Sequence, residues 1–118
     1  MAAFTTDSDG YLVELDLWDE EVAQALARAL EIELTPDHWA VLHCARQFYS
    51  SYQLSPVMRP MVNALKADHP QLASSLALMR LFPSPEAANH PATTSIRNGS
   101  PAKRIACIAG LPRPTNCL

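Results

Sequence analysis

The sequence predicts a small α+β domain, with a short strand or hairpin near the N-terminus followed by an array of about five helices. Apolar and polar residues alternate from Tyr11 to Asp16, directly after the turn signal Asp9-Gly10, as in a half-buried strand. Most of the remaining chain carries apolar residues at helical spacing. With 118 residues and 48% hydrophobic content, one domain over 1–118 with one core is the natural size.

The first helix is predicted at about 19–31. Acidic residues fill its first turn, at Asp19, Glu20 and Glu21, where they interact favourably with the helix dipole. The apolar residues of this stretch fall on one face and are Val22, Ala25, Leu26, Ala29 and Leu30.

Two further helices are predicted at 36–53 and 56–67, joined by a short turn. Each begins with a capping residue followed by proline, a pair that favours a helix start; the pairs are Thr35-Pro36 and Ser55-Pro56. We expect Pro60 to kink the second of these helices, because proline supplies no backbone N–H.

The amino-acid composition changes twice in the last third of the chain. A more apolar helix is predicted at 72–82, and residues 83–101 then become rich in Pro, Ser, Thr, Asn and Ala, as in a loop insertion. A final helix is predicted at 102–109, and Gly110 is placed to cap its C-terminus.

Residues 110–118 form a predicted mobile C-terminal arm that ends in the penultimate residue Cys117. Pro112 and Pro114 restrict the backbone and keep the arm out of helices and sheets. With Gly110 as the hinge, seven extended residues at about 3.3 Å each give the arm a reach of roughly 23 Å. This arm is suited to placing a sulfur atom inside the active site of another protein.

Composition excludes several other classes of protein. The formal net charge is -3, whereas nucleic-acid binders usually carry a basic footprint. No apolar run reaches the roughly 20 residues of a membrane span, and the N-terminus lacks the features of a signal peptide, so we expect a cytoplasmic protein. The three cysteines show no metal-ligand spacing, so we expect neither a zinc site nor a disulfide framework.

Several segments together resemble the TusE/DsrC/DsvC family of sulfur carriers. The resemblance runs from about Gly10 to the last residue, interrupted by the insertion at 83–101, and its most specific part is the terminal Gly-Leu-Pro-x-Pro-x-x-Cys-x signature. The matching segments are Leu34-Thr35-Pro36-Asp37-His38-Trp39, Phe48-Tyr49, Leu54-Ser55-Pro56-Val57-Met58-Arg59-Pro60, Leu81-Phe82-Pro83 and 108–118.

The resemblance implies a small N-terminal β-hairpin or meander packed on helices, with a mobile C-terminal arm. In TusE-like members the penultimate cysteine, here Cys117, carries a persulfide. It receives sulfur from the TusBCD complex and passes it to the tRNA thiolase MnmA for 2-thiolation of the wobble uridine. Such a sulfurtransferase works within a relay, without turnover alone, and needs no metal or organic cofactor.

DsrC-like members of the family use a second cysteine of the arm, eleven positions before the penultimate one. Here that position holds Ala106, and Cys107 follows it. In a helix one residue turns the side chain by about 100°, so the Cys107 thiol is expected to point elsewhere. The TusE-like relay is therefore preferred, and the alternative is a thiol/disulfide partner of a dissimilatory sulfite reductase that uses Cys107 and Cys117.

A helix-turn-helix DNA-binding regulator is a further alternative, because 36–53 and 56–67 form two helices with a short turn. Arg59, Asn63 and Lys66 would face the groove of DNA. Few cations in an acidic protein give only a weak attraction to phosphates, so direct nucleic-acid binding is not expected.

The other residues with chemical potential are given structural roles. We expect Cys44 to be a small buried apolar residue, and His38 and His43 to have surface or capping roles. Trp18 and Trp39 are expected to pack in the core or in a surface groove.

Overall fold

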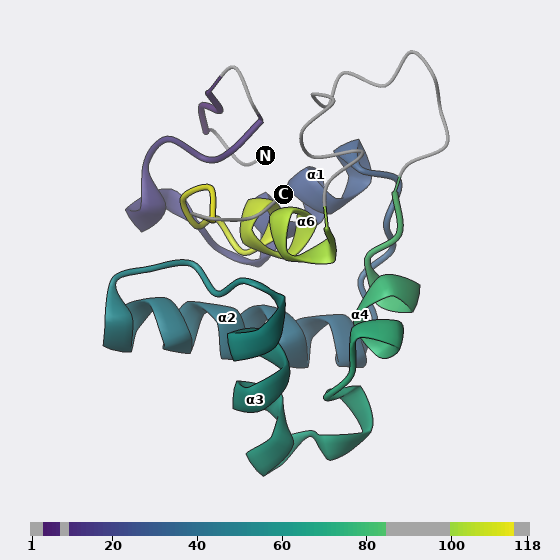
Figure 1. Cartoon of the computed structure of the whole chain (residues 1–118). Coiled ribbons are helices and arrows are strands. Elements are labelled where there is room, and N and C mark those ends of the chain that lie inside the picture. The colour runs from purple at the N-terminus through teal and green to yellow at the C-terminus, as the bar shows by residue number, and fades with distance from the viewer. Residues whose placement is uncertain (1–3, 8–9, 85–99, 115–118) are drawn as a thin grey trace.

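The computed structural model describes residues 4–7, 10–84 and 100–114, and these residues form an array of helices around one core (Figure 1). Within the described residues there are five α-helices and two short 3₁₀ helices. The α-helices are α1 (Glu20–Ala29), α2 (Pro36–Tyr52), α3 (Met58–Asp68), α4 (Ser75–Leu81) and α6 (Pro101–Ile108), and the 3₁₀ helices are η1 (Leu15–Leu17) and η2 (Pro70–Leu72).

The predicted N-terminal β-hairpin, and with it the α+β class, is wrong for the described part of the chain. There the segment makes one isolated antiparallel bridge, between Thr6 and Leu12, and then turns into η1. The physical reason is burial: the adjacent residues Tyr11 and Leu12 are both buried, whereas Val13 is exposed. Neighbouring side chains of a strand point to opposite faces, so this burial pattern does not fit a strand with one buried face.

Helix α1 begins as predicted and ends two residues early. The Asp19 carboxylate accepts a hydrogen bond from the backbone N–H of Val22 at 2.9 Å and caps the helix. The predicted range reached residue 31, but Glu31 has a positive φ of 62° and lies outside the helix.

Helix α2 matches the predicted range and is tied to α4 by a histidine. The Nδ1 atom of His38 accepts a hydrogen bond from the backbone N–H of Thr35 at 3.1 Å. Its Nε2 atom lies 2.6 Å from the carbonyl oxygen of Leu81, the last residue of α4. His38 therefore has the predicted capping role, but it is buried rather than on the surface.

Helix α3 starts at Met58, two residues later than predicted from Ser55-Pro56. Pro60 is consequently the third residue of the helix, within the first turn, where backbone N–H groups have no partner in the helix. Proline is tolerated in such a place without loss of a hydrogen bond.

The predicted helix at 72–82 is shorter, because η2 and a turn precede α4. The Ser74 hydroxyl accepts a hydrogen bond from the backbone N–H of Ala77 at 3.1 Å and sets the start of α4. Of the predicted insertion at 83–101, residues 85–99 lie outside the described residues, and Pro101 is already the first residue of α6. The single domain, its insertion and its mobile arm stay predictions.

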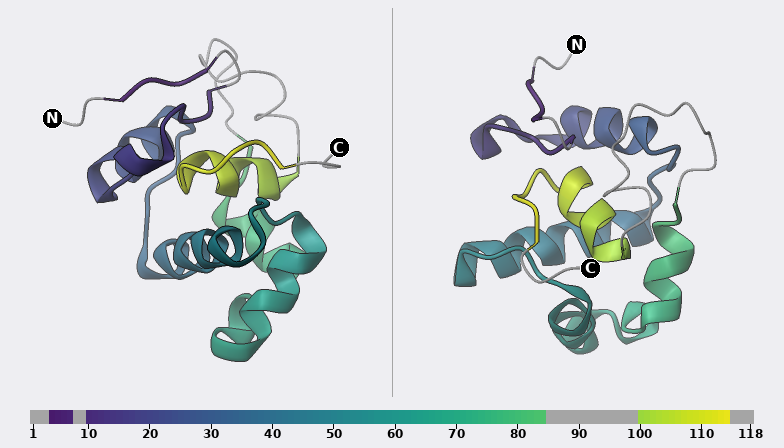
Figure 2. Two further views of the ribbon diagram at one scale, coloured as in Figure 1. Left: turned by 90° about the vertical axis from the view of Figure 1, so that its left-hand side faces the viewer. Right: turned by 45° about the horizontal axis from the view of Figure 1, so that its top comes forward.

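Helix α6 is the centre of the molecule. It runs between α1 and α2 (Figures 1 and 2) and also contacts α3. Every residue from Pro101 to Leu111 is buried, including the charged side chains of Lys103 and Arg104. The body of the protein therefore surrounds α6 and the turn that follows it.

None of the described helices is both long enough and apolar enough to cross a membrane.

Candidate functional site

The structure describes the start of the predicted C-terminal arm but not the predicted sulfur-carrying cysteine. Cys117, the predicted sulfur carrier, lies outside the described residues. Gly110, Pro112, Pro114 and Cys107 are described, and they show how the root of the arm, defined here as residues 109–114, is held by the body.

Helix α6 ends in a Schellman turn, the arrangement of two reversed hydrogen bonds that closes many helices. The backbone N–H of Leu111 donates to the carbonyl of Ala106 at 2.9 Å, and that of Gly110 donates to Cys107 at 3.1 Å. Gly110 has a φ of 71°, the left-handed conformation that this turn requires. The predicted termination of the last helix at Gly110 is confirmed to within one residue.

Gly110 also lies in direct contact with Trp18. A Cβ atom added at Gly110 would be 2.4 Å from Cδ1 and 2.9 Å from Cγ of the indole ring. Such distances are shorter than any van der Waals contact, so a side chain here would displace Trp18 or the turn. The sequence identifies the glycine as a cap, and the structure adds that it makes room for a tryptophan.

Two side chains donate to the last carbonyls of α6. Trp18 donates from Nε1 to the carbonyl of Ile108 at 2.8 Å, and Arg46 of α2 donates from Nη1 to the carbonyl of Ala109 at 2.6 Å. The Arg46 guanidinium carbon lies 4.2 Å from the centre of the Trp18 ring, a cation–π contact. Burial lowers the pKa of Arg46, but an arginine keeps its charge at neutral pH, and this charge complements the negative end of the α6 dipole.

A third donor holds the arm root beyond the turn. The hydroxyl of Ser55, in the connection between α2 and α3, donates to the carbonyl of Pro112 at 2.5 Å. Pro112 and Arg113 are exposed, whereas Pro114 is buried again. The described part of the arm root therefore follows the surface of the body and is attached to it at several points.

These three donors, Trp18, Arg46 and Ser55, were not identified from the sequence as parts of the site. They lie 90, 63 and 57 residues before the carbonyls that they bind. The sequence predicts Trp18 in the core or in a surface groove and Ser55 as a helix cap. No local pattern signals contacts over such separations.

Cys107, the candidate second thiol, points into the body. It is 3% exposed, and its Sγ atom donates to the carbonyl of Gly10 at 3.4 Å. Burial raises the pKa of this thiol to about 12, with the Asp7 carboxylate as the smaller cause. Because the thiolate is the reactive form of cysteine, Cys107 is held unreactive in this position.

Cys44 is half-buried, not fully buried as expected, in a groove between α2 and α3. Burial, followed by the charge of Asp68, raises the pKa of its thiol. Trp39 and His43 stack in the same groove, with ring centres 6.0 Å apart, and Phe48 and Tyr52 pack at 4.6 Å. Both causes disfavour the thiolate, so we assign Cys44 no role in thiol chemistry.

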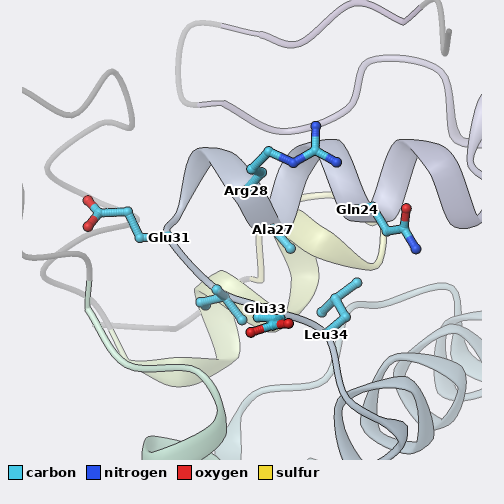
Figure 3. A pocket seen from close by; sticks show the side chains of 7 residues that line it. Gln24, Ala27, Arg28, Glu31, Glu33 and Leu34 are labelled. Atoms are coloured by element: carbon cyan, nitrogen blue, oxygen red, sulfur yellow. The ribbon is translucent and has the colours of Figure 1, made fainter.

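A second hollow, of about 460 Å³, lies at the C-terminal end of α1 (Figure 3). The side chains that line it include no cysteine and no histidine, and they are Gln24, Ala27, Arg28, Glu31, Ile32, Glu33 and Leu34. Within the described residues, no group of three or more His, Cys, Asp or Glu side chains is arranged to hold a metal ion.

Comparisons with known proteins agree on one family. The sequence model of the family described as "DsrC like protein" matches residues 1–95, a match that stops before the arm. The chain is 38% identical to the "Sulfurtransferase TusE homolog" of Haemophilus influenzae over 96% of its own length and 91% of that protein. It is also 38% identical to "Sulfurtransferase TusE" of Sodalis glossinidius, over 97% and 93%.

Solved structures of similar fold bear the name DsrC. The NMR structure of Allochromatium vinosum DsrC superposes with a TM-score of 0.76 at 32% identity, covering 98% of this chain and 90% of that one. The crystal structure of the oxidized γ-subunit of the dissimilatory sulfite reductase (DsrC) from Archaeoglobus fulgidus gives 0.71 at 31% identity, over 98% and 92%.

Proposed function

The chain belongs to the DsrC-like family, and we propose that it is a sulfur-relay carrier of the TusE kind, with Cys117 as the residue that carries the sulfur. Relatives named TusE share 36–38% of its sequence over nearly all of its length. Cys117 is the penultimate residue of the sequence, three positions after Pro114. A thiol in this place is suited to entering another protein's active site.

The proposed chemistry is sulfur transfer between thiols without net oxidation. The Cys117 thiolate attacks the outer sulfur of a donor persulfide, the donor's S–S bond breaks, and the donor cysteine leaves as a thiolate. Cys117 then carries Cys-S-SH. In the next step a thiolate of the acceptor attacks that outer sulfur, and the Cys117 thiolate is the leaving group.

The observation that favours a one-cysteine relay is the burial of Cys107. A DsrC-like disulfide cycle would need Cys107 to react with Cys117, which requires a thiolate and Cα atoms within about 7 Å. Cys107 is 3% exposed, its thiol pKa is raised to about 12, and it points toward Gly10. The residue eleven positions before Cys117 is Ala106, which has no sulfur.

In this proposal the relay serves 2-thiolation of the wobble uridine of tRNA, in the cytoplasm. The sulfur donor would be a complex resembling TusBCD, and the acceptor a tRNA thiolase resembling MnmA. The tRNA would be bound by the thiolase, so this acidic chain needs no nucleic-acid site of its own.

The deciding experiment is intact mass spectrometry of the reduced protein after incubation with a cysteine desulfurase, cysteine and the upstream relay proteins. We expect one added sulfur in the wild type and in Cys107→Ala, and none in Cys117→Ser. The Cys107→Ala variant is the matched control, because it removes the other thiol near the arm. Failure of wild-type Cys117 to take up sulfur would contradict the proposal.

The second candidate is a DsrC-like thiol/disulfide partner of a dissimilatory sulfite reductase. It is favoured by the two DsrC structures, one of them an oxidized subunit of such a reductase. The same experiment separates the two functions. A loss of two hydrogens, or a trisulfide that maps to Cys107 and Cys117, would establish the DsrC-like cycle in place of the relay.

A further inference from the structure

We propose that Trp18, Arg46 and Ser55 are positioning residues that attach the arm root to the body, so that the reach of Cys117 is set from Pro114 rather than from Gly110. The inference rests on the proposed function and concerns how Cys117 reaches its partners. The chain from Pro114 to Cys117, here called the tether, then limits how far Cys117 reaches, in place of a hinge at Gly110.

The first support is the set of donors around the arm root. Trp18, Arg46 and Ser55 come from three separate parts of the fold, and each donates to a different carbonyl, those of Ile108, Ala109 and Pro112. Donors on both sides of Gly110 fix its position and the direction of the chain that follows.

The second support is the fit of Gly110 and Leu111. The indole ring of Trp18 lies where a Cβ of Gly110 would be, and Arg46 lies against the same ring. Leu111 is 1% exposed, and its N–H closes the Schellman turn. Rotation of the chain at Gly110 would break this packing and the hydrogen bonds together, which makes Gly110 a poor hinge.

The third support is the burial of Pro114, which brings the chain back to the body after two exposed residues. Cys117 is three positions after Pro114 in the sequence. At about 3.3 Å per residue, the Cα atom of Cys117 lies within roughly 10 Å of that of Pro114, less than half of the reach from Gly110.

This short reach defines the kind of partner that the carrier fits. The acceptor must be a folded protein whose reactive thiol is recessed by no more than the tether's length, and its surface must contact the body around the arm root. A short tether keeps the carried sulfur at a high effective concentration in the partner's pocket, since that concentration falls as about the −3/2 power of tether length.

The test is transfer of sulfur from preloaded Cys117 to the purified MnmA-like thiolase, followed as a single turnover at increasing acceptor concentration. Ser55→Ala removes the donor to Pro112 and weakens the attachment of residues 112–114. The tether then lengthens from three residues toward six, so the rate constant at saturating acceptor should fall by up to about threefold, with the half-saturating concentration unchanged.

Two further variants make the test independent of any one side chain. Insertion of Gly-Ser-Gly between Pro114 and Thr115 also lengthens the tether to six residues and leaves all three donors in place. It should give the full loss of about threefold. Trp18→Phe, which keeps a ring but removes the indole N–H, should lower the saturated rate while the half-saturating concentration stays constant.

The matched control is Ser75→Ala, since Ser75 is an exposed serine at the start of α4. It should transfer sulfur at the wild-type rate. Alkylation of Cys117 by iodoacetamide should proceed equally in all variants, because a small reagent does not depend on the tether.

The outcomes separate the inference from the proposed function. Normal loading of Cys117, with equal transfer rates in wild type, Ser55→Ala and the insertion variant, would overturn the inference alone. A raised half-saturating concentration with an unchanged saturated rate in Ser55→Ala would overturn it too, because Ser55 would then contact the partner. No loading of wild-type Cys117 would instead contradict the proposed function itself.

Discussion

Two helices of this protein end in the same turn, yet one turn carries a glutamate and the other a glycine. At the end of α1 the left-handed residue is Glu31, with φ 62°, and at the end of α6 it is Gly110, with φ 71°. Both turns have the two hydrogen bonds of a Schellman motif. Those bonds are Glu31 N–H to Arg28 at 3.0 Å and Ile32 N–H to Ala27 at 2.9 Å, against Gly110 N–H to Cys107 at 3.1 Å and Leu111 N–H to Ala106 at 2.9 Å.

The difference between the two turns lies in what surrounds them. Glu31 lies on the surface, and its side chain extends away from the other labelled residues of the α1 hollow (Figure 3). Gly110 lies under Trp18, with no space for a Cβ. The left-handed backbone accepts a glutamate at the end of α1. The requirement for glycine at the end of α6 therefore comes mainly from the contact between Gly110 and Trp18.

The largest expected effect comes from Gly110→Ala. The left-handed conformation and the collision with Trp18 add, so the free energy of unfolding should fall by about 2–4 kcal/mol. Urea denaturation measures it, with Glu31→Ala as the control at the other turn, where the change should stay below about 1 kcal/mol. Equal losses at the two positions would show that Trp18 does not restrict Gly110.

A double-mutant cycle assigns the difference to Trp18 itself. In a Trp18→Leu background, where the ring is absent, Gly110→Ala should cost less than in the wild type by about 1–2 kcal/mol. The same cycle between Trp18 and Glu31 should give no coupling beyond the usual ~0.3–0.5 kcal/mol of error for independent sites. A cycle in which Trp18 and Gly110 behave additively would remove the tryptophan from the explanation.

The two turns also differ in the residue whose carbonyl accepts the hydrogen bond from the left-handed residue. At the end of α1 this residue is Arg28, which is exposed, and at the end of α6 it is Cys107, which is buried. The folded-state pKa of Cys107, about 12, lies above its ordinary value of 9.0. The neutral thiol therefore stabilises the fold fully below pH 9, and this stabilisation is lost as the pH rises toward 12. The unfolding free-energy difference between wild type and Cys107→Ala should shrink by ~1 kcal/mol from pH 8 to pH 10.

Urea denaturation of the two proteins at both pH values is the measurement. Titration of tyrosines and lysines affects wild type and variant alike, so it cancels in the difference. A difference that stays constant between pH 8 and pH 10 would mean that the Cys107 thiol ionises freely in the folded protein, which would also remove the argument against its reaction with Cys117.

The parts of the fold that are predictable from the sequence are those decided within one turn of a helix. The Thr35-Pro36 pair gave the start of α2, and Gly110 gave the end of α6. Predictions from the sequence were wrong where a residue far away in the chain determines the local structure. Ser55 carries a cap signal, but its hydroxyl donates to Pro112 and α3 starts at Met58.

The N-terminal segment shows the same limit in the pattern of burial. Alternation from Tyr11 to Leu15 predicts a strand, but the core takes up the adjacent pair Tyr11 and Leu12. Likewise, the contact of Trp18 with Ile108 joins residues 90 apart, and it depends on the packing of α6 between α1 and α2. The family was predictable from the sequence segments, with the terminal signature as the most specific, but the attachment of the arm root was not.

The smallest expected effect is a gain in stability at the α1 turn. Glycine adopts the left-handed conformation without the cost of about 1–2 kcal/mol that other residues meet, although it loses some 0.4–1 kcal/mol through the greater freedom of the unfolded chain. Glu31→Gly should therefore be more stable than Glu31→Ala by about 0.5–1 kcal/mol, measured by urea denaturation. Alanine is the reference because it removes the contacts of the glutamate side chain from the comparison. The remaining difference in unfolding free energy then reflects the backbone conformation. The same alanine-to-glycine exchange at position 110 should give a gain several times larger, and the excess is the free energy with which the Trp18 contact selects glycine at the arm root.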